Sequence, residues 1–384
     1  MSAWDEVAEA WRIRPDTIYL NHGSYGPAPT SVLAARRAYQ QQLEAQPMDF
    51  YNRHFESLWL AARDRLASFV GCRSSDLAFV ENATAGMNVV ARSVSLQPGD
   101  RVVLNDHEYG AVRRIWQRAC DESGATLDVV SLPQPLEDPQ QVVESLVGDR
   151  VPPCRLLVVS HITSATALIL PVAEICRRAR ERGTMVCVDG PHAPLQVPVE
   201  LTQLGCDFYT ASCHKWLCAP LGSGFLYVAP QWQETIRPMQ LSWGRVQPAE
   251  PQRWFEELMW TGTRDSSPYL AVPAAIDFFQ RLGVERVRET LCRMARRAEG
   301  RLQEELRTEP LGRGPGWYGS MAHLPLPPGD SHRLQQRLWE RYGIEVPIIG
   351  WSGQRFIRVS WHLYNRDEHL DALLIGLRQL LAEE

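Results

Sequence analysis

Short apolar segments that alternate with helical stretches constrain the fold of this chain more than any other feature. The segments begin near residues 77, 102, 127, 155, 185, 207 and 224. Strand-length apolar runs separated by helices are typical of a mostly parallel sheet covered by helices on both faces. After residue 228 the pattern changes to long helices and then a mixed region. We therefore predict an α/β fold with a seven-stranded, mostly parallel sheet and a smaller α+β C-terminal domain.

The size and charge of the chain exclude several classes of protein. Its 384 residues exceed what one hydrophobic core usually holds, which predicts about two domains. A net charge of -5 gives no basic field, so we expect no nucleic acid partner. No apolar run approaches the roughly 20 residues that span a bilayer, and residues 1–12 are acidic and amphipathic. We expect a cytoplasmic protein with no membrane partner.

The cysteines do not indicate a disulfide framework or a metal site. Nine cysteines, an odd number, are scattered singly along the chain. Cys206, Cys213, His214 and Cys218 are types of residue that bind zinc, but they include no C-x-x-C pair. Neighbouring residues of an extended chain also point to opposite sides. We predict buried thiols and no metal.

A carboxylate and a lysine each follow the end of a predicted strand. Asp189 follows the strand at 185–188, and Ser212, His214 and Lys215 follow the strand at 207–211. Open α/β sheets bind ligands at this edge. Pyridoxal phosphate (PLP) needs an amine for its aldehyde, an acid for its pyridine nitrogen and donors for its phosphate. Lys215 can supply the amine, Asp189 the acid, and Ser212 and His214 the donors.

These residues lie in motifs that resemble those of the class V aminotransferases, a PLP-dependent family of fold type I. The motifs are Val-Asp-Gly-Pro-His-Ala at 188–193, with His192 at the family's His or Gln position, and Ser-x-His-Lys at 212–215. Further matches extend from Leu20 to Ser360, and those at 20–26 and 81–84 are similar to the isopenicillin N epimerase-like branch. The family also includes cysteine desulfurases. The resemblance implies a large PLP-binding domain at 20–262 and a small domain from 1–19 plus 263–384.

The resemblance also implies further contacts to the cofactor. Residues 82–88 open a helix after a strand, and a helix N-terminus binds phosphate. Taken alone, Thr84 is better explained as an N-cap, but the family match makes Thr84 and Ala85 phosphate ligands and His192 a cofactor contact. Ser164 falls beside the ring hydroxyl, at a position where several members of the family carry Asn.

The family places a flat side chain against the pyridine ring at the segment 105–111. Aligned on Glu108, this residue is Tyr109, whose phenol can also move protons. His107 is the alternative stacking residue. Without the motif, Tyr109 would be explained as a residue that starts a helix at the edge of the core.

Three more residues are assigned by the resemblance. Asn21 lies in a loop that approaches the substrate carboxylate, although its side chain is also suited to capping a plain turn. Arg358 has the planar fork that binds an α-carboxylate, although a solvent-facing arginine in a strand is the alternative. Thr263 follows Gly262 where the family reaches the phosphate of the partner subunit, which implies a homodimer with shared active sites.

The expected chemistry begins at the Cα of an amino-acid substrate. Lys215 acts as the base, Asp189 keeps the ring protonated, and Tyr109 completes the predicted catalytic set. Desulfurases need a cysteine on a mobile loop, but residues 345–354 contain none. We therefore rank epimerisation first, a C-S β-elimination lyase or an aminotransferase as alternatives, and a non-catalytic PLP-binding protein as a distant alternative.

Overall fold

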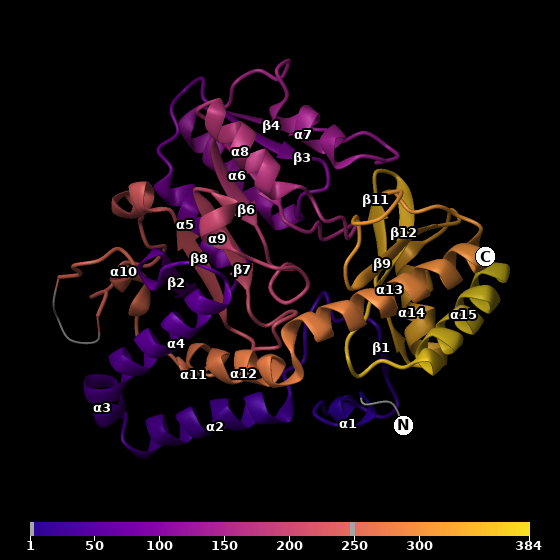
Figure 1. Cartoon of the computed structure of the whole chain (residues 1–384), viewed down its shortest axis with the longest axis horizontal. Helices are drawn as coiled ribbons and strands as arrows, with labels where there is room; N and C mark the ends of the chain where they lie inside the picture. The colour runs from indigo at the N-terminus through magenta and orange to yellow at the C-terminus, as the bar shows by residue number, and fades with distance from the viewer. Residues whose placement is uncertain (1–3, 246–249) are drawn as a thin grey trace.

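The computed structural model describes residues 4–245 and 250–384, and its centre is a seven-stranded sheet (Figure 1). The predicted fold is confirmed, because each of the seven apolar segments forms a strand of this sheet. In sheet order the strands are β2 (Leu77–Val80), β8 (Gly224–Val228), β7 (Phe208–Ser212), β6 (Met185–Asp189), β5 (Leu156–Ser160), β3 (Arg101–Asn105) and β4 (Thr126–Val130).

The direction of the strands brings the candidate site together. Among these seven strands, β8 runs in the opposite direction to the other six. β6 and β7 are parallel, with Asp189 opposite Thr210, so the carboxyl ends of both strands reach the same edge. Asp189 ends β6, and Lys215 lies three residues beyond the end of β7. The sheet thus places the carboxylate and the amine side by side.

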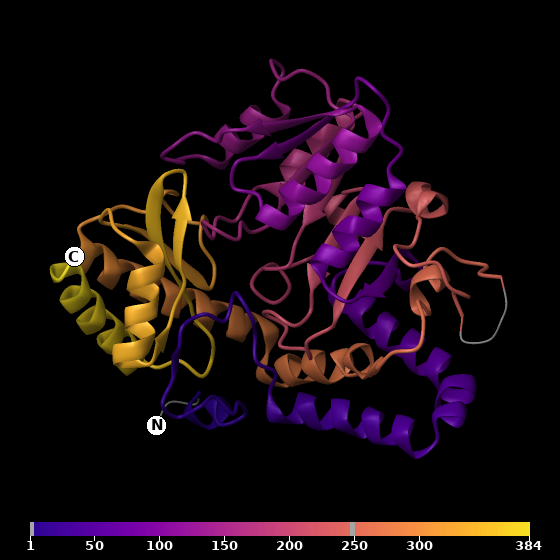
Figure 2. The same cartoon turned by 180° about the vertical axis from the view of Figure 1, so that it is seen from behind.

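Helices cover both faces of this sheet. α5 and α6 pack on each other at the front of Figure 2, and α7 and α8 pack on each other at the front of Figure 1. Each amphipathic helix turns its apolar side inward, which is what the alternating sequence requires. Their bounds are Ala83–Ser93 for α5, Gly110–Ser123 for α6, Pro139–Val147 for α7 and Val172–Glu181 for α8.

Further helices lie below the seven-stranded sheet in Figure 1. α2 (Thr30–Ala45) and α4 (Glu56–Phe69) pack against α11 (Ser267–Leu270) and α12 (Val272–Leu282). The short elements are α1 (Asp5–Ala8), α3 (Pro47–Asp49), a π-helix η1 (Phe50–Phe55), 3-10 helices η2 (Ser74–Asp76) and η3 (Pro230–Thr235), α9 (Leu201–Leu204) and α10 (Glu256–Met259). Within the described ranges no helix is long and apolar enough to cross a bilayer.

The C-terminal region forms a second, smaller layer of strands and helices, as predicted. An antiparallel sheet has the order β11-β12-β9, and the first strand of the chain pairs with β10 in parallel. The elements are β1 (Ile18–Tyr19), α13 (Val284–Leu306), β9 (Met321–Leu326), α14 (Ser331–Tyr342), β10 (Ile344–Glu345), β11 (Ile348–Trp351), β12 (Gln354–Ser360) and α15 (Asp367–Ala382).

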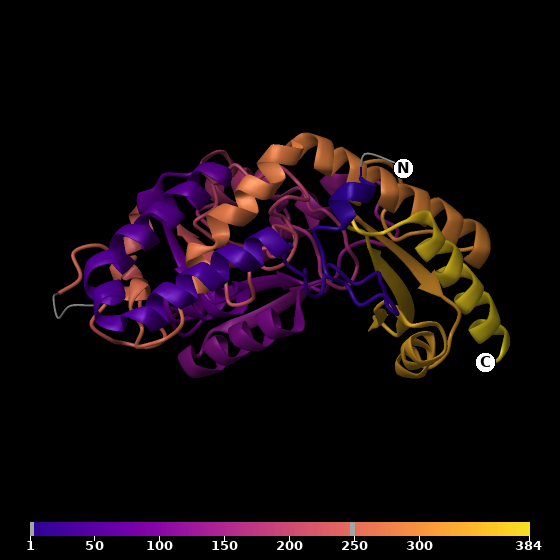
Figure 3. The same cartoon turned by 90° about the horizontal axis from the view of Figure 1, so that it is seen from below.

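The long helix α13 belongs to both hydrophobic cores. Val287 and Leu291 are buried in the core of the large sheet, whereas Ala298 and Leu302 are buried in the core of the small one. Figure 3 shows this helix running from one lobe to the other. The predicted domain boundary at 262/263 stays a prediction. Residues 1–3 and 246–249 of the predicted domains lie outside the described residues.

A close approach between α5 and β7 gives a testable prediction. A Cβ added to Gly86 would lie 2.0 Å from Oγ1 of Thr210, whose hydroxyl donates to Ala83 O. We expect Gly86→Ala to destabilise the fold by about 1 to 3 kcal/mol through overpacking, measured as a lower midpoint of thermal unfolding. Gly300→Ala is the control, because nothing lies within 4 Å of an added Cβ there. An unchanged midpoint for Gly86→Ala would contradict the tight packing.

Candidate active site

A cavity of about 300 Å³ lies where the ends of β6 and β7 meet the N-terminal loop and β12. Nine predicted site residues line it: Thr84, Tyr109, Ser164, Asp189, His192, Ser212, His214, Lys215 and Arg358. Asn21, Ala85 and Thr263 do not line it. The structure therefore brings together most of the residues singled out from the sequence, which come from segments far apart in the chain.

The carboxylate of the site, Asp189, is buried, and the amine of Lys215 belongs to a partly buried residue that lines the cavity. Burial and the charge of Arg358 lower the pKa of Lys215 to about 7. Burial raises the pKa of Asp189 to about 7, and the charge of Lys215 opposes this shift. Both groups are thus poised near neutral pH, where a buried lysine is able to act as a nucleophile or a base. A bound cation beside Asp189 would stabilise its ionised form.

The N-terminus of α5 forms an anion cradle. The N-cap is Asn82, whose side-chain oxygen accepts from the N–H of Ala85, so the alternative that Thr84 is the N-cap is wrong. Ser212 Oγ accepts from the N–H of Ala83 at 3.1 Å, which joins the end of β7 to this helix. Thr84 lines the cavity and is exposed. The positive end of the helix dipole thus faces the predicted phosphate position.

An unpaired histidine nitrogen supports the fit of a phosphate at this place. His214 lines the cavity, and its Nδ1 is buried without a hydrogen-bond partner. A buried polar atom normally has a partner. A phosphate oxygen at the end of α5 would supply one. With Lys215 and Asp189 in the same cavity, the side chains present fit PLP.

Tyr109, rather than His107, lies at this cavity. Tyr109 is the N-cap residue of α6 and is 49% exposed. The ring of His107 instead packs on Trp351 of the small domain, with ring centroids 4.2 Å apart. His107 Nδ1 also lies 2.7 Å from Thr166 Oγ1. The side chain of His107 is therefore engaged away from the site.

Glu108 is partly buried, and its place in the family motif had pointed only to its neighbour Tyr109. Its carboxylate accepts hydrogen bonds from the N–H and the hydroxyl of Ser160, both at 2.7 Å, and from Asn105 Nδ2. Burial is the main cause that raises its pKa to about 8. Glu108 thereby ties the Tyr109 loop to the end of β5. The Glu-Tyr pair after a strand was the only sequence signal for it.

Arg358 is buried on β12 and reaches the loop after β5 and the N-terminal loop. Its guanidinium donates to the backbone oxygen of Ser164 and to Ser24 Oγ at 3.1 Å. Nε has no partner, and burial lowers the pKa of Arg358 to about 10. The alternative of a solvent-facing strand arginine is wrong, because the side chain is 4% exposed. Ser24 was not predicted, and only the structure reveals it.

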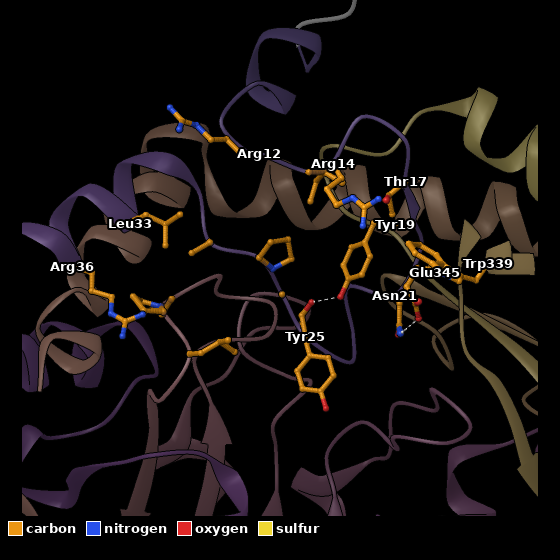
Figure 4. A pocket seen from close by; sticks show the side chains of 17 residues that line it. Arg12, Arg14, Thr17, Tyr19, Asn21, Tyr25, Leu33, Arg36, Trp339 and Glu345 are labelled. Atoms are coloured by element: carbon orange, nitrogen blue, oxygen red, sulfur yellow. Dashed lines mark hydrogen bonds between the residues drawn. The ribbon is translucent and has the colours of Figure 1, made fainter. Parts of the chain in front are cut away.

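The side chain of Asn21 points away from the cavity that contains Lys215. Its Nδ2 donates to Glu345 Oε1 at 3.1 Å, and it lines a second cavity of about 690 Å³. Figure 4 shows Asn21 beside Glu345, and the hydrogen bond from Tyr19 to the backbone of Tyr25. The predicted contact of Asn21 with a substrate carboxylate therefore has no support from the position of this side chain.

Cys218 belongs to a buried cluster with His22 and His362. Its Sγ lies 3.6 Å from Nε2 of each histidine. The two rings are stacked, with centroids 3.9 Å apart and planes 13° apart. A metal lies close to the plane of each imidazole that binds it, so two stacked rings cannot share one ion. His22 Nε2 instead lies 3.2 Å from the backbone oxygen of Lys215.

His22 fixes the backbone of Lys215 through a hydrogen bond to its carbonyl oxygen. His22 Nδ1 lies 2.8 Å from the hydroxyl of Tyr364, and burial lowers the pKa of His22 to about 3, so the ring is neutral. The phenol donates to Nδ1, and Nε2–H then donates to Lys215 O. A Cβ on Gly26 would lie 2.1 Å from this same oxygen. The backbone of Lys215 is thus fixed by groups from the N-terminal loop and the small domain.

Fold and site together define a fold type I PLP-dependent enzyme, and comparison with known proteins narrows the class. The Aminotransferase class-V family matches residues 18–373. Isopenicillin N epimerases of Amycolatopsis lactamdurans and Streptomyces clavuligerus are 39% and 36% identical, each over 99% of both chains. The chain belongs to the class V aminotransferase family.

More distant relatives are named for other reactions. A putative L-cysteine desulfhydrase 1 of Oryza sativa subsp. japonica is 29% identical over 95% of this chain and 83% of its own. The solved structure of the cystine C-S lyase C-DES with cysteine persulfide has a TM-score of 0.81 at 23% identity, covering 94% of this chain and 97% of that chain. This likeness shows the shared fold, in agreement with the predicted fold class.

The lowered pKa of Lys215 gives a prediction for cofactor capture. Only the neutral amine attacks an aldehyde, so the rate at which cofactor-free protein captures PLP should rise about tenfold per pH unit below pH 7 and level off above about pH 8. Borohydride trapping followed by peptide mapping measures the rate, with Lys215→Ala as the blank. Arg358→Gln should move the midpoint upward, because a positive charge is lost. A rate still rising beyond pH 9 would indicate an ordinary lysine.

Proposed function

We propose that this enzyme inverts the configuration at the Cα of an amino-acid substrate, in the manner of an isopenicillin N epimerase. The observation that carries this proposal is the match to two such epimerases along 99% of both chains. PLP, when bound, withdraws electrons from Cα and so acidifies its proton. The remaining work belongs to side chains of the cavity.

Each role is assigned to a residue placed at the cavity. Lys215 would hold the cofactor and, once freed, move the Cα proton, and Asp189 would bind the pyridine nitrogen. Arg358, with an unpaired Nε, would bind the substrate carboxylate. Tyr109 would contact the ring face and is our candidate for the second proton transfer that inversion requires. Thr84, Ser212 and His214 would bind the phosphate.

The hairpin β11-β12 argues against a persulfide-forming desulfurase. Trp351 at its tip packs on His107 and donates from Nε1 to Asp106 O at 2.9 Å. Residues 345–360 contain no cysteine, and no cysteine of the described ranges lines the cavity. Sulfur transfer to the protein needs a mobile, exposed thiolate near the substrate. The tip of this hairpin instead carries the indole of Trp351, which is fixed by its contacts with His107 and Asp106.

A C-S β-elimination lyase is the second candidate function. The 29% identity to a putative L-cysteine desulfhydrase favours it over transamination among the alternatives. Elimination would use the same Lys215 and no added protein nucleophile, so the residues of the cavity are compatible with it. The two reactions differ in whether the bond between Cβ and sulfur of the substrate breaks. Product analysis therefore distinguishes them directly.

We also propose a homodimer that shares its active sites. Thr263 is exposed and lies outside the cavity of its own chain. Its predicted phosphate contact therefore requires a second copy, as the family resemblance implies. A cytoplasmic location remains a prediction from the sequence.

The reaction class is tested in deuterated water. The PLP-loaded enzyme, incubated with isopenicillin N and a panel of L-amino acids, should form the opposite Cα epimer carrying one solvent deuterium, since the Cα proton exchanges during inversion. Chiral chromatography with mass spectrometry measures this, and Lys215→Ala should lose at least about 1,000-fold of the rate. Pyruvate and ammonia from cysteine, without inversion of any substrate, would instead support the lyase.

The shared site is tested by mixing subunits. A Lys215→Ala chain and a Thr263→Ala chain should each be weakly active. Heterodimers contain one site with Lys215 from one chain and Thr263 from the other, so random exchange should restore about a quarter of wild-type activity. Thr263→Ser, which keeps the hydroxyl, is the matched control. An active monomer by light scattering would contradict the proposal.

A further inference from the structure

The two ring nitrogens of His192 have different partners. Nε2 lies 3.1 Å from Nζ of Lys215, and Nδ1 accepts from the indole Nε1 of Trp216 at 3.3 Å. Both His192 and Trp216 are 0% exposed, so no solvent competes. Gln196 donates to the backbone oxygen of His192 at 2.8 Å, which fixes the residue further. The imidazole of His192 is thus held between Lys215 and Trp216, which are adjacent in the sequence.

The indole determines which nitrogen of His192 carries the proton. An indole N–H is only a donor, so Nδ1 must be an acceptor. Burial, with the charges of Lys215 and Arg358, moves the pKa of His192 well below its usual value, and the ring is neutral. A neutral imidazole with an accepting Nδ1 carries its proton on Nε2. Nε2–H therefore donates to Lys215, whose amine must offer a lone pair.

We propose that Trp216 is a positioning residue that fixes His192 as the Nε2–H tautomer, so that His192 is a hydrogen-bond donor to the reacting nitrogen of Lys215 and never its base. This inference rests on the proposed function only in taking Lys215 as the reacting amine. It also removes His192 from the candidates for the second proton transfer of an epimerisation. In the opposite tautomer, Nδ1–H of His192 and the indole N–H of Trp216 would be two donors facing each other without an acceptor.

Other charged groups face this pair and have to be held constant in a test. Lys215 faces Asp189 at the end of β6 and Arg358 on β12, and His192 also faces His22 of the N-terminal loop. His214 lies next to Lys215 in the loop after β7. None of these contacts the indole nitrogen of Trp216, whose partner is His192. His22 also packs on the indole ring, with ring centroids 5.1 Å apart, and Trp216→Phe keeps an aromatic ring for this contact while removing the indole N–H.

The tautomer is measured directly in cofactor-free wild-type protein. Two-bond ¹H–¹⁵N correlation of ¹⁵N-histidine-labelled protein should give a protonated Nε2 and an unprotonated Nδ1 for His192, at neutral pH and above. His192→Gln assigns the signals by their loss. A protonated Nδ1 would overturn the proposal. This result does not depend on which reaction the loaded enzyme performs, so its failure is distinct from failure of the epimerase proposal.

The consequence for Lys215 is measured with matched tryptophan variants. In Trp216→Phe the ring of His192 is free to place its proton on Nδ1 and accept from a protonated Lys215, so the pKa of the lysine should rise by about one unit. The pH dependence of amine labelling, read by mass spectrometry at the peptide with Lys215, gives this pKa. Trp59→Phe is the control, because Trp59 is equally buried but its Nε1 has no partner.

A double-mutant cycle separates this role from packing. In a His192→Leu background, Trp216→Phe should leave the pKa of Lys215 unchanged, because leucine has no donor or acceptor whose orientation the indole could fix. A shift of the same size with and without His192 would assign the effect to packing and overturn the proposal. If the pKa of Lys215 is the same in Trp216→Phe as in Trp59→Phe, the proposal is overturned as well.

Discussion

The structure depends on bringing an amine and a carboxylate together at the carboxyl ends of two adjacent parallel strands. Asp189 is buried and Lys215 is partly buried, and the loss of hydration drives each toward its neutral form. Neutral partners attract each other weakly, so the site needs other contacts to hold its shape. Hydrogen bonds through His192 and the carbonyl of Lys215 supply them. PLP would supply a partner for each group: its cationic ring nitrogen for Asp189 and its aldehyde for the amine of Lys215.

The sequence predicted the elements whose causes are local. Apolar runs of strand length predicted seven strands in a mostly parallel sheet. Asp189 and Lys215 could be found because Asp189 ends one strand and Lys215 follows three residues after the end of another. The N-cap of α5 was harder, since Asn82 and Thr84 are both capping residues within two positions of each other. Only the hydrogen bond from the N–H of Ala85 to the side chain of Asn82 in the folded structure decides between them.

Residues whose environment is set by distant segments could not be predicted in this way. His107 and Tyr109 were open alternatives, and the outcome depends on Trp351, which contacts this loop from 245 positions away through Asp106. Asn21 is turned toward Glu345, 324 positions along the chain. The role of Trp216 has the same origin, because its partner His192 belongs to another loop of the sheet edge. Such pairings carry no local periodicity, and they appear only when the chain is folded.

The continuous helix α13, with one half in each core, has a consequence for how the enzyme folds and moves. Neither core is complete without its share of this helix, since Val287 and Leu291 close the large one while Ala298 and Leu302 close the small one. A chain cut at residue 262 would expose apolar surface on both pieces, so the two lobes are expected to form as one cooperative unit. Relative motion of the lobes must then occur as bending of this helix or sliding along it, which limits how far β12 can carry Arg358 away from the cavity.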